Sequence, residues 1–322
     1  MILYIILYAI HFDKDNKLNI KNHQRKVQKL ILLSTFTSLL AYGDGENSVG
    51  ELAAVTDVLT QSTECNETIV IRSQSLDKAQ LDSACMLLIA QEDKFHQVFN
   101  TRGKPVADDN NAKMRANIYS SRDEFVKYAT AHFNMPTDNG GMYLEGYPDK
   151  ANNQAEFVAY ERSGKIWNLK HEYIHYLDGR FNKYGDYCNG LHDDHAGPEF
   201  CPTPNLAYPH IVWWAEGLGE YLAWGDNNPK AIALAKDNSF ALSELFNTSS
   251  NENTGSDRVY RWGYLAVRFM MEQHRDLIDE MLVHIRRGNW QAYQRLIKSW
   301  GTRLDGEFST WLATLNIAEK SQ

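Results

Sequence analysis

The sequence has few cysteines, no excess of basic charge and no N-terminal apolar run long enough to cross a bilayer. Its formal net charge is −8, whereas a protein that binds nucleic acid would present a basic face, so we expect no nucleic-acid partner. The apolar stretch at residues 1–10 is too short for a membrane span, and it lacks a preceding positive charge and a clear cleavage site. We therefore predict neither a membrane partner nor a secretion signal in this stretch.

The four cysteines form two local pairs in the sequence, Cys65 with Cys85 and Cys188 with Cys201. No C-x-x-C motif occurs and neither pair lies beside a matched second pair, so two short-range disulfides are favoured over a zinc cluster. Because four cysteines allow three connectivities, the sequence alone leaves the pairing open. Disulfides form in oxidising compartments, and we expect an extracellular protein although no clear signal peptide is present.

Length and patterning predict an α+β protein. The 322 residues could hold one large or two modest domains, and 43% apolar with 12% aromatic residues is ample for a core. β-branched and aromatic runs predict strands near 68–71, 116–119, 141–145 and 157–160. Apolar residues at helical spacing predict helices at 22–42, about 48–60, about 77–99 and 122–133, and an almost wholly helical chain beyond 166.

His171-Glu-Tyr-Ile-His175 is the motif that indicates chemistry. Two histidines four residues apart project from one face of a helix and can ligate one Zn²⁺. The intervening Glu172 would lie beside a zinc-bound water, where it can act as the catalytic base. The same pentapeptide occurs by chance in proteins that bind no metal, so a third ligand decides between the two interpretations.

A glutamate from a second helix is the predicted third ligand. The metzincin pattern would need Gly and His where this chain has Asp178 and Phe181, so that class is excluded. We expect Glu216 to bind zinc and Glu220, one turn later, to accept the free ring N–H of a metal-bound histidine. Two solvated helix carboxylates are the alternative, which the apolar residues at 213–222 disfavour because an unpaired charge among them would be costly.

These motifs resemble the catalytic core of the bacterial collagenases, particularly the Vibrio-type branch. The likeness runs from about residue 50 to the C-terminus. It includes HEYIHYLDGRF at 171–181, WWAEGLGEY at 213–221 and the glycine-rich stretch at 137–146. The resemblance implies a gluzincin metallopeptidase, and only H-E-x-x-H among these motifs is shared widely.

A domain organisation follows from this resemblance. We expect residues 46–322 to form a thermolysin-like zinc metallopeptidase domain, with a twisted mixed sheet in an upper α+β part at about 46–178. A mainly helical lower part would occupy about 179–322. Residues 1–45 would be a short helical remnant of an N-terminal activator-like region, since full-length relatives carry a long helical domain there.

The resemblance also implies roles for an edge strand. Gly140 and Gly141 would begin a strand that pairs with an extended substrate, with Tyr143 on the same substrate-binding surface. Glu145 resembles the calcium-binding glutamate of the family, and backbone carbonyls just past the active-site helix, such as that of Gly179, would complete an oxygen shell. The alternative for Glu145 is a carboxylate on a surface strand.

One tyrosine is also assigned by resemblance. Tyr260 falls where the family places a tyrosine that donates a hydrogen bond to the tetrahedral oxyanion. Tyr264 is the rival, and a tyrosine buried in the core is the alternative for both.

Together these observations predict a zinc-dependent endopeptidase that hydrolyses collagen- or gelatin-type peptide bonds. Zn²⁺ is the expected cofactor, with Ca²⁺ added by resemblance, and the expected partner is collagen, gelatin or another extended chain bound by a monomer. One alternative is a gluzincin endopeptidase without collagen preference. The other is an inactive collagen-binding remnant, against which the intact set His171, Glu172, His175 and Glu216 argues.

Overall fold

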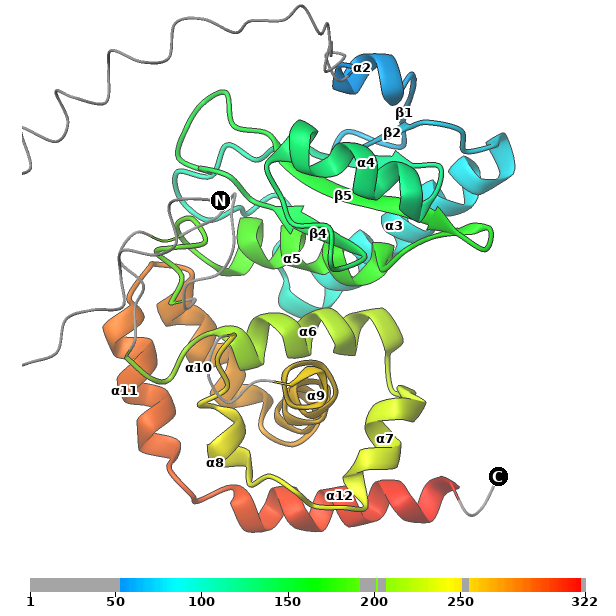
Figure 1. Cartoon of the computed structure of the whole chain (residues 1–322). Coiled ribbons are helices and arrows are strands. Elements are labelled where there is room, and N and C mark those ends of the chain that lie inside the picture. The colour runs from blue at the N-terminus through cyan, green and yellow to red at the C-terminus, as the bar shows by residue number, and fades with distance from the viewer. Residues whose placement is uncertain (1–52, 192–200, 202–206, 251–254, 320–322) are drawn as a thin grey trace, which may run out of the picture. The chain divides into compact units, whose positions relative to one another are not determined.

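The first half of the described chain forms a mixed β-sheet with helices packed on it (Figure 1). This computed structural model describes residues 53–191, 201, 207–250 and 255–319. The strand order is β1-β2-β3-β5-β4, in which β2, β3 and β5 are parallel, β1 and β4 are antiparallel to their neighbours, and β6 pairs with β5. The strands are β1 Gln61–Glu64, β2 Ile69–Ser73, β3 Met114–Tyr119, β4 Gly141–Leu144, β5 Ala155–Arg162 and β6 Lys165–Ile166.

Three helices cover the two faces of this sheet. Alternate strand residues such as Ile71, Ile118 and Phe157 point to the face covered by α3 and α5. The residues between them, such as Val158, point to the face covered by α4. The sheet is therefore buried on both sides, as its parallel strands require. The helices are α3 Lys78–Phe99, α4 Arg122–Phe133 and α5 Leu169–Asn182.

Local capping chemistry sets the ends of α3 and α4. Asp77 and Gln80 form a reciprocal capping box at the start of α3, and the Ser121 side chain caps the start of α4. Both helices end at an asparagine in the left-handed conformation, Asn100 and Asn134. These signals lie in the sequence itself, which explains why the two helices match their predicted ranges closely.

The second half of the described chain is helical and is organised around α6 and α9. Helix α6 packs against α5 on one side and against α9 on the other (Figure 1). A π-helical turn, η1 (Asp257–Trp262), leads directly into α9. The helices are α6 Val212–Trp224, α7 Pro229–Ala235, α8 Leu242–Leu245, α9 Gly263–Gln273, α10 Arg275–Ile285, α11 Trp290–Trp300 and α12 Asp305–Glu319.

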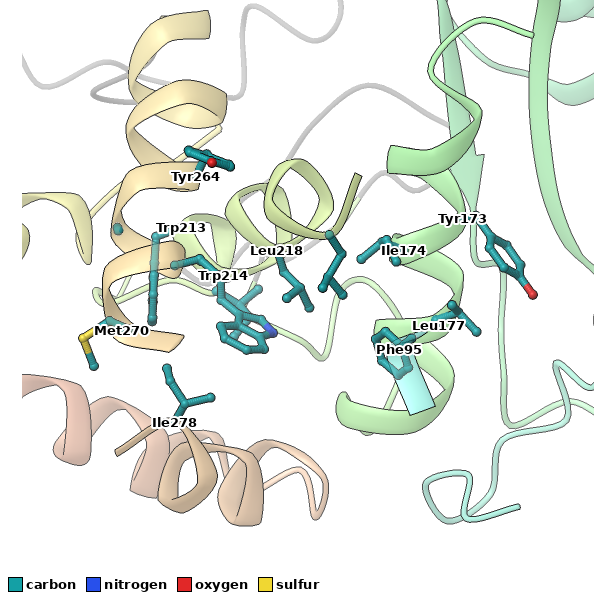
Figure 2. Packing of buried hydrophobic residues seen from close by; sticks show 14 of the residues in the cluster. Phe95, Tyr173, Ile174, Leu177, Trp213, Trp214, Leu218, Tyr264, Met270 and Ile278 are labelled. Atoms are coloured by element: carbon teal, nitrogen blue, oxygen red, sulfur yellow. The ribbon is translucent and has the colours of Figure 1, made fainter. Parts of the chain in front are cut away.

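Apolar side chains fill the interface between α5 and α6 (Figure 2). Ile174 and Leu177 of α5 lie opposite Leu218 of α6, and all three are fully buried. Trp213 and Trp214, on the first turn of α6, are fully buried in the same cluster. Burial of each such side chain contributes about 1.5–3 kcal/mol. The helices that carry the H-E-x-x-H motif and Glu216 are thus held face to face.

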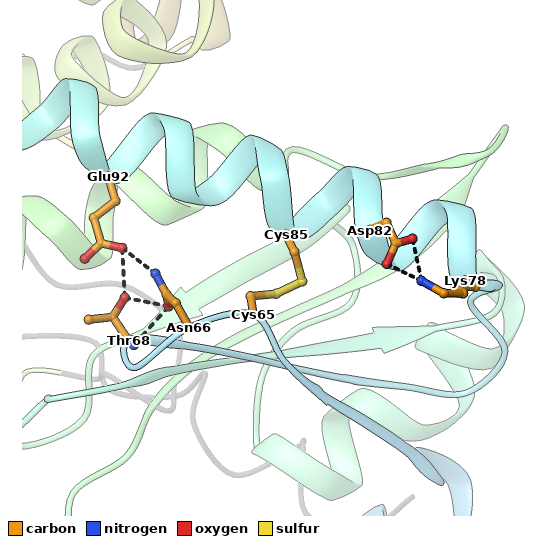
Figure 3. Close-up of a disulfide and its surroundings, with 7 residues drawn as sticks. All are labelled: Cys65, Asn66, Thr68, Lys78, Asp82, Cys85 and Glu92. Carbon is orange, nitrogen blue, oxygen red and sulfur yellow. Dashed lines mark hydrogen bonds and ion pairs between the residues drawn. A yellow bond between two sulfur atoms is a disulfide. The ribbon is translucent and has the colours of Figure 1, made fainter.

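Both cysteine pairs form disulfides, Cys65–Cys85 and Cys188–Cys201, which confirms the expectation of two local bridges. The first joins the segment after β1 to α3 (Figure 3). Further along α3, the Glu92 carboxylate accepts a hydrogen bond from Thr68 Oγ1 at 2.8 Å. The segment after β1 is therefore attached to α3 at two points.

The mixed α+β class is confirmed, but the first described segment differs from the prediction. Of the helix expected at about 48–60, residues 48–52 lie outside the described residues, and within 53–60 the helix α2 covers Val55–Val58 alone. Strand β1 then begins at Gln61. Strand β1 was not predicted, and its pairing with β2 is set by the partner strand and not by a local apolar pattern. The helix predicted at 22–42 and the 1–45 remnant lie outside the described residues, so the domain boundary stays a prediction.

No helix among the described residues is both long enough and apolar enough to cross a bilayer.

Helices α6 and α9 cross at two glycines. A Cβ added to Gly217 would collide with the carbonyl oxygen of Gly263 and lie 2.7 Å from Cγ2 of Val267. A backbone atom cannot move aside alone, so any side chain at this position must shift a whole helix. The short distance between α6 and α9 at this crossing therefore requires glycine at position 217.

We expect Gly217→Ala to lower the melting temperature measured by circular dichroism, because overpacking a core typically costs about 1–3 kcal/mol. Gly306→Ala on α12 is the matched control, since nothing lies within 4 Å of the added Cβ and alanine favours the helix. The control should melt at or slightly above the wild-type temperature. Equal melting temperatures for the two variants would show that the α6–α9 crossing does not require glycine at position 217.

Candidate metal centre and active site

Helix α5 places two histidines side by side in a cleft. His171 and His175 are four residues apart, so their rings project from one face of the helix and their Nε2 atoms lie 3.0 Å apart. His171 is buried, and the His175 side chain is 17% exposed. Both line a cleft of about 780 Å³ whose walls come from β4, α5, α6 and η1. This volume is typical of a ligand-binding site.

Helix α6 brings two glutamates to the histidines. Glu216 Oε2 lies 3.1 Å from His171 Nε2 and 3.5 Å from His175 Nε2. Glu220, one turn later, has Oε1 3.1 Å from Nδ1 of His171. The other oxygen of Glu220 accepts a hydrogen bond from Asn228 Nδ2 at 3.0 Å. Each ring nitrogen of His171 therefore faces a different carboxylate of α6.

The charges of these groups are strongly coupled. Burial alone would lower the pKa of His171, but the carboxylates of Glu216 and Glu220 raise it to about 10. Burial alone would raise the pKa of Glu216, but His175 and His171 hold it well below its usual range. Without a metal ion, His171 is therefore protonated at neutral pH. A divalent cation in this position would take over the role of that proton.

Glu172 is held beside the cluster by two hydrogen-bond donors. Asn168 Nδ2 donates to Oε1 at 2.9 Å, and the backbone N–H of Tyr143 donates to Oε2 at 3.0 Å. Glu172 is 7% exposed and lines the cleft. Each carboxylate oxygen has two lone-pair sites, so both oxygens can still accept a proton or a water from the cleft.

Strand β4 borders the cleft at the edge of the sheet. Backbone N–H and C=O groups point to alternate sides of a strand from one residue to the next. Those of Gly141 therefore point to the same side of β4 as those of Tyr143. A Cβ on Gly140 would collide with the Trp167 ring, and one on Gly141 would lie 2.6 Å from the carbonyl oxygen of Val158. Packing within the protein therefore also requires glycine at these two positions, in addition to the pairing with substrate that the family resemblance implies.

The two candidate tyrosines lie in different surroundings. Tyr260, on η1, is 41% exposed, lines the cleft and has its ring centroid 5.9 Å from that of His171. Tyr264 is fully buried, and its hydroxyl donates to the carbonyl of Gly225 at 2.9 Å. The Glu216 carboxylate and burial raise the pKa of Tyr260, so its hydroxyl remains a hydrogen-bond donor.

Glu145 follows β4 and lines the same cleft, but it is not part of the group formed by His171, His175 and Glu216. It is 3% exposed, which excludes the alternative of a solvated surface carboxylate. A Cβ on Gly179 would collide with Oε1 of Glu145, so the carboxylate lies against the backbone of α5. The Lys183 ammonium is 3.4 Å from each of its oxygens.

Sequence reasoning missed the residues that support the site. Asn168 lies four residues before Glu172, and this helical spacing was a usable signal. Asp178 is buried and accepts bonds from Nε1 of Trp214 at 3.2 Å to each oxygen, so it joins α5 to α6. Lys183 lies at the end of α5, and no local pattern relates it to Glu145.

Three atoms of the cluster fit a tetrahedral metal ion. The pairs among His171 Nε2, His175 Nε2 and Glu216 Oε2 are 3.0, 3.1 and 3.5 Å apart. Zinc–nitrogen distances of about 2.0–2.1 Å at tetrahedral angles require ligand atoms about 3.3 Å apart. Within the described ranges this is the one group of three such side chains with ligand atoms so close together. Such a donor set, with a helix-borne glutamate beside it, is typical of metallopeptidases.

Comparison with known proteins identifies the family. The family model described as collagenase matches residues 46–311. A microbial collagenase of Vibrio alginolyticus is 42% identical over 264 residues, which are 80% of this chain and 30% of the relative. One from Vibrio vulnificus is 40% identical over 268 residues, 82% of this chain and 31% of the relative. Collagenase ColT of Clostridium tetani is 25% identical over 225 residues, 64% of this chain and 20% of the relative.

The chain therefore belongs to the collagenase family, which is a family of metalloproteases, and this confirms the resemblance seen in the sequence. It spans about 30% of the length of the Vibrio relatives.

The pKa of His171 predicts how the metal-free protein responds to pH. Because its folded-state pKa is about 10 and its ordinary value is 6.5, the protonated ring adds stability that is full below pH 6.5. That contribution is lost as the pH rises through 10. Urea unfolding of metal-free protein at pH 6.5 and pH 10 should show a larger loss of stability for the wild type than for His171→Gln. Parallel losses in the two proteins would contradict the raised pKa.

Proposed function

We propose that this chain is a zinc-dependent endopeptidase of the gluzincin type. In this proposal His171, His175 and Glu216 hold the ion, and Glu172 is the catalytic base. The observation that carries it is the convergence of three ligand atoms from two helices on one point, with Glu172 beside them. A sheet-and-helix part and a helical part with the cleft between them support a thermolysin-like arrangement.

The chemistry follows from the positions of these side chains. When bound, zinc polarises the scissile carbonyl and lowers the pKa of a water molecule to about 7. Glu172 would be the residue that accepts a proton from the attacking water at a carboxylate oxygen and delivers it to the leaving amine. Asn168 and the backbone N–H of Tyr143 hold that carboxylate in place. Glu220 accepts the Nδ1–H of His171, which leaves Nε2 free to act as a ligand.

Tyr260 is the candidate donor to the oxyanion. Its ring lies next to that of His171 in the cleft, and its hydroxyl stays protonated. A phenol in this position can donate a hydrogen bond to the oxygen that gains negative charge as water attacks the carbonyl. The hydroxyl of Tyr264 is already bonded to the Gly225 carbonyl, which favours Tyr260 over its rival.

We infer that the substrate binds as an extended chain along β4. The strand lies at the edge of the sheet, and Gly140, Gly141 and Tyr143 line the cleft beside Glu172. Pairing with such an edge uses backbone hydrogen bonds and suits an unfolded chain such as gelatin. The printed names of the relatives support collagen-type chains as the substrate class. A peptidase without collagen preference remains the alternative.

The biological setting is proposed on the same basis. The two disulfides support an oxidising, extracellular compartment. The chain spans about 30% of its Vibrio relatives, so cleavage of triple-helical collagen is a proposal that rests on the family. A peptidase domain at 46–322 and a monomeric state stay predictions.

Glu172→Gln should lower kcat on fluorescein-labelled gelatin by about 10²–10⁴-fold, because it removes the general base and keeps all three proposed metal ligands. Zinc content, measured by atomic absorption, should stay at the wild-type level. Glu280→Gln, an exposed change on α10, is the matched control and should retain full activity. Equal cleavage by Glu172→Gln and wild type would rule out the mechanism.

The same assay separates the candidate functions. Removal of metal should abolish cleavage and added zinc should restore it. Faster cleavage of gelatin than of casein supports the collagen-type substrate class, whereas equal rates favour a general endopeptidase. No cleavage of either substrate by the zinc-loaded wild type would favour the inactive remnant.

Tyr260→Phe should lower kcat on a Gly-Pro-containing peptide by about 10²–10³-fold, because one hydrogen bond to the oxyanion is lost. KM and zinc content should change little. Tyr264→Phe is the matched control: it removes the bond to Gly225, so it should lower the melting temperature and leave kcat near the wild-type value. The reverse pattern would assign the role to Tyr264.

A further inference from the structure

A buried carboxylate connects the edge strand to the end of the active-site helix. Glu145 directly follows β4, and its carboxylate lies against Gly179 in the last turns of α5. Its backbone carbonyl accepts bonds from Nδ2 of Asn153 at 2.8 Å and of Asn111 at 3.1 Å, so the backbone here is also held in place. An anion so well buried requires a compensating cation.

Lys183 supplies that cation. It follows the last residue of α5, its side chain is 10% exposed, and its Nζ is 3.4 Å from Oε1 and 3.4 Å from Oε2 of Glu145. The aliphatic part of the side chain is held close to Gly190, since a Cβ added to that glycine would lie 3.1 Å from Cδ of Lys183. The lysine therefore has little room to swing away from the carboxylate.

The neighbouring carboxylates have partners of their own. Asp109 pairs with Arg180 at 2.6 Å. Asp178 accepts hydrogen bonds from Trp214 and from Asn182. Burial raises the pKa of Glu145, and the Lys183 ammonium opposes that rise by favouring the carboxylate. Lys183 is thus the cation in contact with Glu145, and its charge also favours the carboxylates of Asp109 and Asp178.

We propose that the Lys183 ammonium occupies the position of a structural cation beside Glu145, so that this chain needs no Ca²⁺ at the site where the family resemblance places one. Ca²⁺ takes six to eight oxygen ligands at about 2.3–2.6 Å. An ammonium equidistant from both carboxylate oxygens occupies the side from which Glu145 would bind the ion. A divalent ion added there would meet a buried positive charge, so the residues present do not fit calcium.

This ion pair has a positioning role for the catalytic base. The ion pair connects the residue after β4 to the end of α5. The backbone N–H of Tyr143, which donates to Glu172, belongs to the same strand. A lysine cannot be removed by dilution or by chelators, so this connection persists when free calcium is low. The effect on catalysis rests on the proposed peptidase function, whereas the ion pair and the absence of calcium binding do not.

The decisive experiment uses the full chain in buffer freed of calcium on a chelating resin, with zinc restored. The wild-type melting temperature should be the same with and without excess CaCl₂, and calorimetry should detect no Ca²⁺ binding. Lys183→Met keeps the aliphatic side chain and leaves Glu145 buried without its cation, so melting should fall by roughly 5–15 °C. Added CaCl₂ should restore part of that loss in this variant.

Two controls complete the experiment. Lys78→Met removes a lysine whose side chain is 87% exposed and whose ion pair with Asp82 is on the surface, so it should change the melting temperature little. The double variant Lys183→Met/Glu145→Gln removes both buried charges and should recover stability without calcium. Melting and binding are also measured in the Glu172→Gln background, so their outcome does not depend on peptidase activity.

Stabilisation of the wild type by CaCl₂ would overturn the proposal. A Lys183→Met variant that melts at the wild-type temperature would overturn it as well, because the lysine would then not be the cation on which Glu145 depends.

Discussion

The clustering of three carboxylates and two imidazoles from α5 and α6, all of them buried or half-buried, is the constraint on which the rest of the site depends. His171 lies between Glu216 and Glu220, with His175 and Glu172 beside it. Buried charges must be compensated, and three acids face only two potential cations. The cluster therefore favours a proton on His171 when no ion is bound, and a divalent cation satisfies the same charge with fixed geometry.

Packing keeps this cluster at the separation that a metal ion needs. The glycine at 217 lets α6 approach α9, and the glycine at 219 lets it approach the His171 ring, where a Cβ would lie 2.9 Å from Cε1. Trp213 and Trp214 fill the space behind these contacts. At the C-terminal end of α5, the pair of Lys183 with Glu145 holds the edge strand. Charge compensation thus joins α5 to both of its neighbours.

Much of the fold could be predicted where local chemistry sets the element. Helix α4 matches its predicted range because Ser121 and Asn134 define its two ends. The strand Gln61–Glu64 was missed, because its four residues show no alternation of apolar and polar side chains, yet it pairs with β2 in the sheet. A strand at the edge of a sheet depends on its partner, and the partner segment lies elsewhere in the sequence.

The sequence by itself predicted the two histidines and the glutamate of the proposed metal site, because residues four apart on a helix must share a face, and an acid among buried aromatics must have a partner. Only the tertiary structure decided that Tyr260 and not Tyr264 borders the cleft, that Asn168 and the backbone of β4 hold Glu172, and that Lys183 reaches Glu145. The spacing of residues along one helix determines which of their side chains share a face of that helix. Which helix faces which is set by long-range packing, which no local pattern records.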